Sequence, residues 1–257
     1  MPEPDHPHFY TELPRPLIAT ARSYAAGLHF PLHSHPRGQF AYAATGAISV
    51  LTPQGNWLVP PQRACWLPAG LEHGMQMHGD VTMLNLFISA QAVANGGLPV
   101  HCSVLDTSPL LRQLLAEAVK LDSLYAKNSR EGRLMALLLD EIGLMAPLAL
   151  NAPLPQEPRL ACLCTELLLQ PGLDIDVDTM AARAGMSRRT FTRLFRQQTG
   201  LGFAQWRQQA CLLNAITRLA EGQAVTRVAF DLGYGSASAF TAAFRKVLGK
   251  PPSGYLR

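Results

Sequence analysis

The chain has 257 residues, of which 48% are hydrophobic, so it is long and apolar enough for two compact domains and unlike a disordered protein. No apolar run approaches about 18 residues, and residues 1–16 lack the basic start and apolar core of an export signal, so we predict a cytoplasmic protein with no membrane partner. The five cysteines form no C-x-x-C pair, which fits a reducing compartment, and we expect them to be packing residues.

The charge is unevenly distributed along the chain. Residues 1–154 contain 9 Lys and Arg against 11 Asp and Glu, whereas residues 155–257 contain 13 against 7. A local excess of positive charge attracts polyanions. We therefore expect the C-terminal part to bind a polyanion.

The first hundred residues have the pattern of short strands. Apolar stretches at 40–44, 48–51, 64–67 and 82–88 are separated by glycine and proline. That rhythm is typical of a small β-barrel or sandwich.

From Ser108 the apolar residues follow helical spacing, with leucine-rich stripes over 110–121 and 134–144. These stripes predict two amphipathic helices that cover the barrel or pair between subunits. We expect part of these stripes to form the interface of a homodimer. Four prolines between Pro147 and Pro158 then predict a semi-rigid linker.

Beyond the linker the chain repeats itself. The segment Ser187–Gly200 returns 49 residues later as Ser236–Gly249, with six of fourteen positions identical. Each copy has a serine that can cap a helix, two phenylalanines at i and i+4, and a terminal glycine. A shorter helix precedes each copy, at 177–184 and 226–232, and ends at a glycine. The pattern is helix-turn-helix, twice.

With the phenylalanines turned inward, the second helix of each unit presents a polar and basic outward face. Such a face suits the major groove of double-stranded DNA, because arginine grips guanine or phosphate and hydroxyls reach base edges. A solvated charged face of a helical bundle is the competing interpretation, but the duplication, the glycine turns and the basicity together favour DNA. The predicted contact residues are Arg188, Arg189, Thr192, Arg193 and Arg196 in the first unit, and Ser236, Ser238, Thr241, Arg245 and Lys246 in the second.

A helix predicted over 203–221 separates the two units by on the order of 28 Å at 1.5 Å per residue. Successive major grooves on one face of the duplex lie about 34 Å apart. The two helices could therefore enter successive grooves, with bending of the DNA closing the difference.

The segment 228–257 closely resembles the C-terminal signature of AraC/XylS-type transcription regulators, and the similarity extends over about residues 158–257. It includes the run Met180–Ser187 and the start of the connecting helix at Trp206. The chain departs from the usual pattern at Cys211, Gly235 and Ala237.

The N-terminal part contains two motifs similar to those of cupins. Gly27-x5-His33-Ser-His35-x3-Gln39-x6-Gly46 resembles the first motif, with glutamine where the enzymes have glutamate, and Pro68-x-Gly70-x-x-His73 resembles the core of the second. If a strand carries both His33 and His35, these side chains face the interior, where His73 could join them.

Three imidazoles can bind a divalent metal such as zinc, nickel or iron. The alternatives are an effector pocket, or a hydrogen-bonded cluster left from an ancestral metal site, because Gln39 supplies only a neutral oxygen. Sequence alone makes no cofactor certain.

The predicted fold is thus α+β with two domains. Residues 1–146 form a cupin-like β-barrel with two trailing helices for effector binding and dimerisation, residues 147–157 the linker, and residues 158–257 an all-α double helix-turn-helix domain.

The predicted function is a transcription regulator that responds to a small effector or metal, contacts RNA polymerase if it activates, and is not an enzyme. The alternatives are a cupin metalloenzyme fused to a DNA-binding domain, and a constitutive DNA-binding dimer without effector.

Overall fold

The computed structural model describes residues 13–255. Residues 1–12 lie outside the described part, and they make up most of the stretch in which the sequence predicts no export signal. Residues 256 and 257, the last two of the C-terminal signature, also lie outside it. Two compact units make up the chain. The first comprises residues up to Val50 together with Val59–Leu148, and the second comprises Leu51–Leu58 together with the residues from Ala149 onward.

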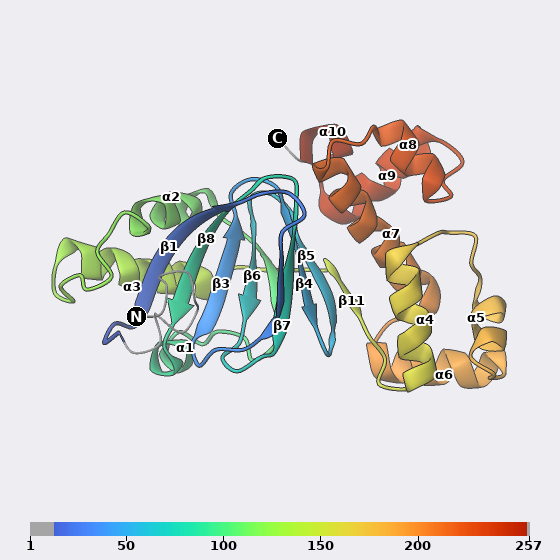
Figure 1. The fold of residues 1–257 in the computed structure, drawn as a ribbon, viewed down its shortest axis with the longest axis horizontal. Coiled ribbons are helices and arrows are strands. Elements are labelled where there is room, and N and C mark those ends of the chain that lie inside the picture. The colour runs from blue at the N-terminus through green and yellow to red at the C-terminus, as the bar shows by residue number, and fades with distance from the viewer. Residues whose placement is uncertain (1–12, 256–257) are drawn as a thin grey trace. The chain divides into compact units, whose positions relative to one another are not determined.

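The strands form two antiparallel-paired sheets, as expected for a barrel or sandwich, without one closed ring of hydrogen bonds among the described strands (Figure 1). The first sheet has the order β1 (Leu17–Tyr24), β8 (Val81–Ile88), β3 (Gly38–Ala43), β6 (Arg63–Leu67), β9 (Ser103–Asp106) and β10 (Pro147–Leu148). The second has the order β11 (Asn151–Pro153), β5 (Gly55–Val59), β4 (Ala47–Thr52), β7 (His73–His78) and β2 (His29–His33).

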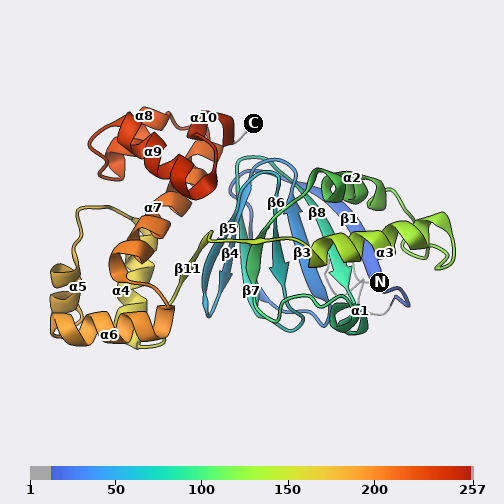
Figure 2. The same cartoon turned by 180° about the vertical axis from the view of Figure 1, so that it is seen from behind.

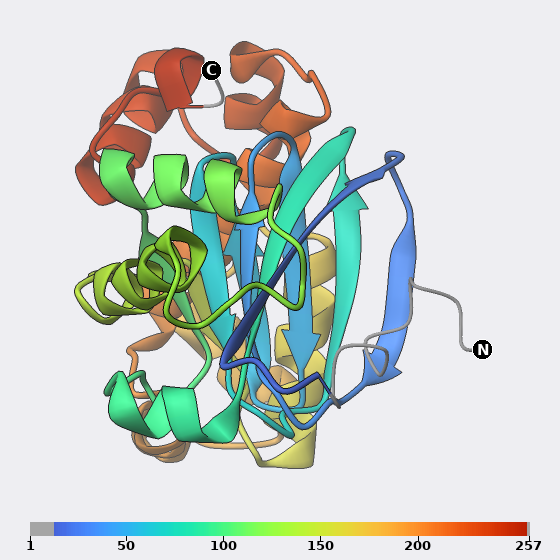
Figure 3. The same cartoon turned by 90° about the vertical axis from the view of Figure 1, so that its left-hand side faces the viewer.

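Alternate residues of the first sheet face opposite ways. One face, which carries Phe40, Trp66 and Leu86, packs beneath three helices into a single buried cluster. Figures 2 and 3 show these helices on one side of the strands. They are α1 (Ala90–Asn95), α2 (Pro109–Ala118) and α3 (Arg130–Gly143). The other face carries Gln39, Cys65 and Asn85, which are also buried.

The two leucine stripes thus pack against the first sheet. Leu111 and Leu115 of α2 and Leu138 of α3 are fully buried in the cluster. Part of each stripe stays outside, since Leu110 is 49% exposed and Leu144 is 75% exposed. Two prolines of the predicted linker lie in short strands, Pro147 in β10, which pairs with β9, and Pro153 in β11, which pairs with β5. Proline is tolerated in such edge positions.

Close packing between Gly38 and Trp66 gives a direct test of this core. A Cβ atom on Gly38 would lie 2.3 Å from the indole Cη2 of Trp66, and that indole is held by its N–H donating to Pro99 O at 2.6 Å. We expect Gly38→Ala to lower the free energy of unfolding by about 1–3 kcal/mol, as overpacking does. Urea denaturation measures it, with Gly235→Ala as the control because its Cβ would meet nothing within 4 Å. An unchanged midpoint for Gly38→Ala would contradict this packing.

The second unit is helical after β11. It contains α4 (Pro158–Leu169), α5 (Val177–Arg183), α6 (Arg188–Thr199), α7 (Phe203–Ala220), α8 (Val225–Asp231), α9 (Ala237–Leu248) and α10 (Pro252–Tyr255). The two predicted helix-turn-helix units are α5–α6 and α8–α9, and the predicted connecting helix is α7. No helix in the described part of the chain is long and apolar enough to cross a membrane.

The cysteines only partly behave as predicted. Cys65, Cys164 and Cys211 are buried, and burial raises the pKa of the Cys164 and Cys211 thiols to about 12. Cys102 is half-buried and Cys162 is exposed on α4, so the packing prediction is wrong for Cys162.

Candidate functional site

The local sequence of each repeat explains the geometry of α6 and α9. The Ser187 hydroxyl accepts from the Thr190 amide and the Ser236 hydroxyl from the Ala239 amide, so both predicted N-caps are present. Gly200 and Gly249 end the helices with φ of 74° and 77°, where glycine is favoured.

Buried phenylalanines fix which side of each helix faces out. Phe191 and Phe195 are fully buried, and Phe195 contacts Phe203 and Trp206 of α7 edge to face. The same pattern recurs in α9, where the rings of Phe240 and Phe244 lie 5.6 Å apart. Because of this anchoring the opposite side of each helix, which carries most of its charged side chains, points to solvent.

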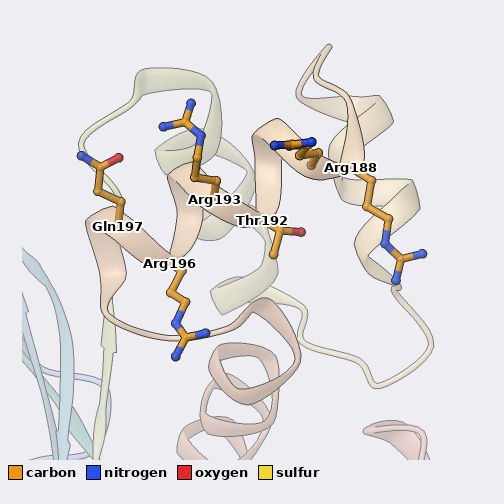
Figure 4. Close-up of a pocket in the computed structure, with 6 residues that line it drawn as sticks. Arg188, Thr192, Arg193, Arg196 and Gln197 are labelled. Carbon is orange, nitrogen blue, oxygen red and sulfur yellow. The ribbon is translucent and has the colours of Figure 1, made fainter.

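The outward face of α6 is a basic surface (Figure 4), which we call the α6 face. It is lined by Arg188, Arg189, Thr192, Arg193, Arg196 and Gln197. Gln197 is not among the predicted contact residues, although its position four residues after Arg193 places it on the same helical face. Arg188 also donates to Asp178 of α5 at 2.9 Å, so it is partly engaged within the unit.

The outward face of α9, the α9 face, carries fewer charged side chains than the α6 face. It is lined by Ala237, Ser238, Thr241, Ala242, Arg245 and Lys246. Of the ten predicted DNA contacts, nine are exposed and Thr241 is half-buried. Between the two faces runs α7, which at 18 residues is about 27 Å long.

A second constellation lies in the sheet unit, where His33, His35 and His73 form what we call the histidine cluster. One ring nitrogen from each lies within 4.8 Å of those of the other two. His33 ends β2 directly opposite His73, the first residue of β7. The sequence predicts His35 on a strand, but it lies in the connection that follows β2. Its own carbonyl oxygen accepts a hydrogen bond from the Gly70 amide. The predicted convergence of the three histidines is nevertheless present.

Backbone carbonyls set the tautomer of all three rings. The Nδ1 atoms of His33, His35 and His73 lie 2.9, 2.6 and 2.9 Å from the carbonyl oxygens of Pro31, Arg37 and Leu71. Since a carbonyl oxygen only accepts, each Nδ1 must carry the hydrogen and each Nε2 the lone pair. Metal-bound histidines are oriented in this way by their outer partners.

Two buried amides extend the cluster. His35 Nε2 lies 3.0 Å from Gln39 Oε1, and Gln39 Nε2 donates to Asn85 Oδ1 at 2.8 Å. With Nδ1 protonated, His35 Nε2 and Gln39 Oε1 are both lone-pair atoms, so a cation between them would stabilise the pair. If the Gln39 and Asn85 amides are both rotated, Gln39 Nε2 donates to His35 Nε2 and Asn85 Nδ2 donates to Gln39 Oε1. Asn85 is not among the predicted site residues; its signal in the sequence is a single amide within the apolar run of β8.

Burial favours the neutral form of two rings of the cluster, those of His35 and His73. Desolvation lowers the pKa of His73 to about 4 and also lowers the pKa of His35. Both rings are therefore neutral near pH 7, which is the form that binds metal. Within the described residues His73 Nε2 is buried without a hydrogen-bond partner. Buried polar atoms are normally satisfied, so this atom fits a missing ligand.

These features define a class of protein: a sheet-rich domain with a polar buried site, followed by a double helix-turn-helix unit with two exposed polar faces. Comparison with known proteins agrees. The AraC-like ligand binding domain matches residues 15–156, and a helix-turn-helix domain matches residues 180–257. The chain belongs to the AraC family. It is a DNA-binding transcription regulator with an N-terminal ligand-binding domain.

Among its relatives, the HTH-type transcriptional regulator NimR of Escherichia coli K12 is 34% identical over 229 residues, covering 88% of this chain and 82% of that protein. Among solved structures, ToxT from Vibrio cholerae O395 is 9% identical, covers 94% of this chain and 97% of its own, and has a TM-score of 0.39. The DNA-binding domain of AdpA in complex with a target DNA is 39% identical, covers 38% of this chain and 89% of its own, and has a TM-score of 0.35.

Proposed function

We propose that this regulator binds its operator through the α6 and α9 faces and responds to a divalent transition metal held by the histidine cluster. His33, His35 and His73 would supply three neutral imidazole ligands, and Gln39 Oε1 stands next to them as a neutral oxygen. Such a set suits zinc, nickel or iron(II). The three histidines come from β2, from the β2–β3 connection and from β7.

The observation that carries this proposal is the shared orientation of the three rings. All three Nδ1 atoms face backbone carbonyl oxygens, so in the neutral rings the Nε2 atoms carry the lone pairs that could bind a common ligand. A purely structural cluster would pair these lone pairs with donors. His73 Nε2 has none among the described residues.

The other assignments follow from the regulatory role. A signal reaches the operator only if the ligand binds one state of the protein better than the other. We propose residues 147–157 as the connection between domains 1–146 and 158–257. We also propose a homodimer through the exposed remainder of the leucine stripes, including Leu110 and Leu144. The chain would act in the cytoplasm without catalysis, and would contact RNA polymerase if it activates.

Metal analysis tests the sensing proposal. Full-length protein purified without chelator should contain metal by elemental analysis, and the metal-free protein should take up one of Zn²⁺, Ni²⁺ or Fe²⁺ stoichiometrically by calorimetry. We expect His73→Ala to weaken binding by at least about 100-fold. His101→Ala removes an exposed imidazole elsewhere in the same unit and should bind as the wild type does.

Two outcomes would contradict the metal assignment. One is the absence of stoichiometric uptake, and the other is equal affinity in His73→Ala and His101→Ala. Either would leave the cluster as the polar lining of a site for an organic effector. DNA binding by the second unit would be untouched by both.

A further inference from the structure

Two cysteines that are distant in the sequence lie side by side in the sheet unit. Cys65 Sγ and Cys102 Sγ are 3.6 Å apart, although 37 positions separate the residues. Cys65 lies on β6, is fully buried and pairs with Val104 of β9. Cys102 stands two residues before Val104, so it is the diagonal neighbour of Cys65 on the same face of the sheet.

We propose that Cys65 and Cys102 form a redox-active dithiol, which a hydroperoxide converts to an intramolecular disulfide, giving the ligand-binding domain a second input. This inference is independent of the proposed metal. It rests on the proximity of the two sulfurs and on their unequal exposure.

The unequal exposure assigns the order of the two steps. Cys102 is half-buried and directly precedes β9, so a small peroxide reaches it, whereas Cys65 is closed off. The Cys102 thiolate attacks the peroxide oxygen and becomes a sulfenic acid, releasing the alcohol or water of the reduced peroxide. The Cys65 sulfur then attacks the sulfenic sulfur and water leaves, so that two thiols are oxidised by one peroxide.

Forming the disulfide requires only a small movement of the two sulfur atoms. Closing 3.6 Å to an S–S bond of about 2.05 Å brings the sulfurs together by roughly 1.5 Å. Cys102 can move because it lies outside the strand ladder, which begins at Ser103. Cys65 cannot, because β6 is paired on both sides, with β3 and β9.

The position of Cys65 links the dithiol to the buried polar face. Ala41 of β3 pairs with Cys65 on one side and with Asn85 on the other, and Asn85 accepts from Gln39. A disulfide at Cys65 is therefore one strand away from Gln39 on β3 and two strands away from Asn85 on β8, the residues that extend the histidine cluster.

Thiol mapping tests the proposal in full-length protein carrying Cys162→Ser, which removes the exposed thiol that could join two chains. With chelator present to keep the protein metal-free, hydrogen peroxide should give peptides linked through Cys65 and Cys102, with the mass of two hydrogen atoms lost. Dithiothreitol should reverse the change. In the added variant Cys102→Ser, which alters only the accessible partner, we expect the Cys65 thiol to be lost at least tenfold more slowly.

Equal rates of Cys65 loss in the two proteins, or Cys102 oxidised with no linked peptide, would overturn the dithiol. If the disulfide also regulates DNA binding, oxidation should change the protein concentration that half-saturates operator DNA at least threefold. Dithiothreitol should reverse this change, and the Cys102→Ser variant should not show it. An unchanged value would overturn that regulatory role. Neither result depends on whether the histidine cluster binds metal.

Discussion

Replacing Arg193 and Arg245 together by alanine is expected to weaken operator binding by about 30-fold at least and by up to about 10⁴-fold. Arg193 lies in the middle of the α6 face, and Arg245 lies in the last turn of the α9 face. A bidentate contact to guanine or phosphate contributes about 1–3 kcal/mol, and the two sites are far enough apart to add. Each single variant should lose roughly the square root of the combined factor.

The measurement is fluorescence anisotropy on an operator selected from random duplexes, at one fixed salt concentration because phosphate contacts make affinity depend on salt. Arg133→Ala is the matched control, since it removes the same charge from an exposed position on α3 in the other unit. We expect its affinity within about twofold of the wild type, as for a surface change away from the site. Full affinity in the double variant would show that these helices do not read the DNA.

Gln39→Glu is expected to raise the affinity of the histidine cluster for Zn²⁺ by about 100-fold. Gln39 Oε1 lies beside His35 Nε2, and Gln39 is only 5% exposed, so a carboxylate there would meet the cation with little screening by water. Without metal the same carboxylate is a buried charge next to neutral rings. The metal-free variant should therefore melt at a lower temperature, and saturation with Zn²⁺ should restore it.

Competition with a chelator of known affinity measures the first effect, and thermal unfolding with and without Zn²⁺ measures the second. Gln113→Glu adds the same charge at an exposed position on α2 and should change neither value. If Gln39→Glu binds Zn²⁺ no better than the wild type, no metal lies within reach of Gln39 and the proposed ligand set is wrong.

Local sequence determined most of the DNA-binding unit. Serine caps, phenylalanines four residues apart and terminal glycines act within one or two turns of helix, so their effect can be read from spacing alone. That is why α6, α7 and α9 begin and end within a residue or two of their predicted limits, and why nine of the ten residues predicted to face outward are exposed. The convergence of His33, His35 and His73 was also predictable, but only from the resemblance to cupin motifs.

Tertiary structure decided what depends on pairing between distant strands. The sequence contains Asn85 and Cys102, but only the registers of β3 with β8 and of β6 with β9 bring them to Gln39 and Cys65. The tautomers of the three histidines likewise depend on carbonyls whose direction is set by turns. Strand register has no local code, because it is fixed by the fit of whole faces against one another. The sequence by itself therefore determined the two recognition helices, whereas the chemistry inside the ligand-binding domain was decided by the packing of its sheets.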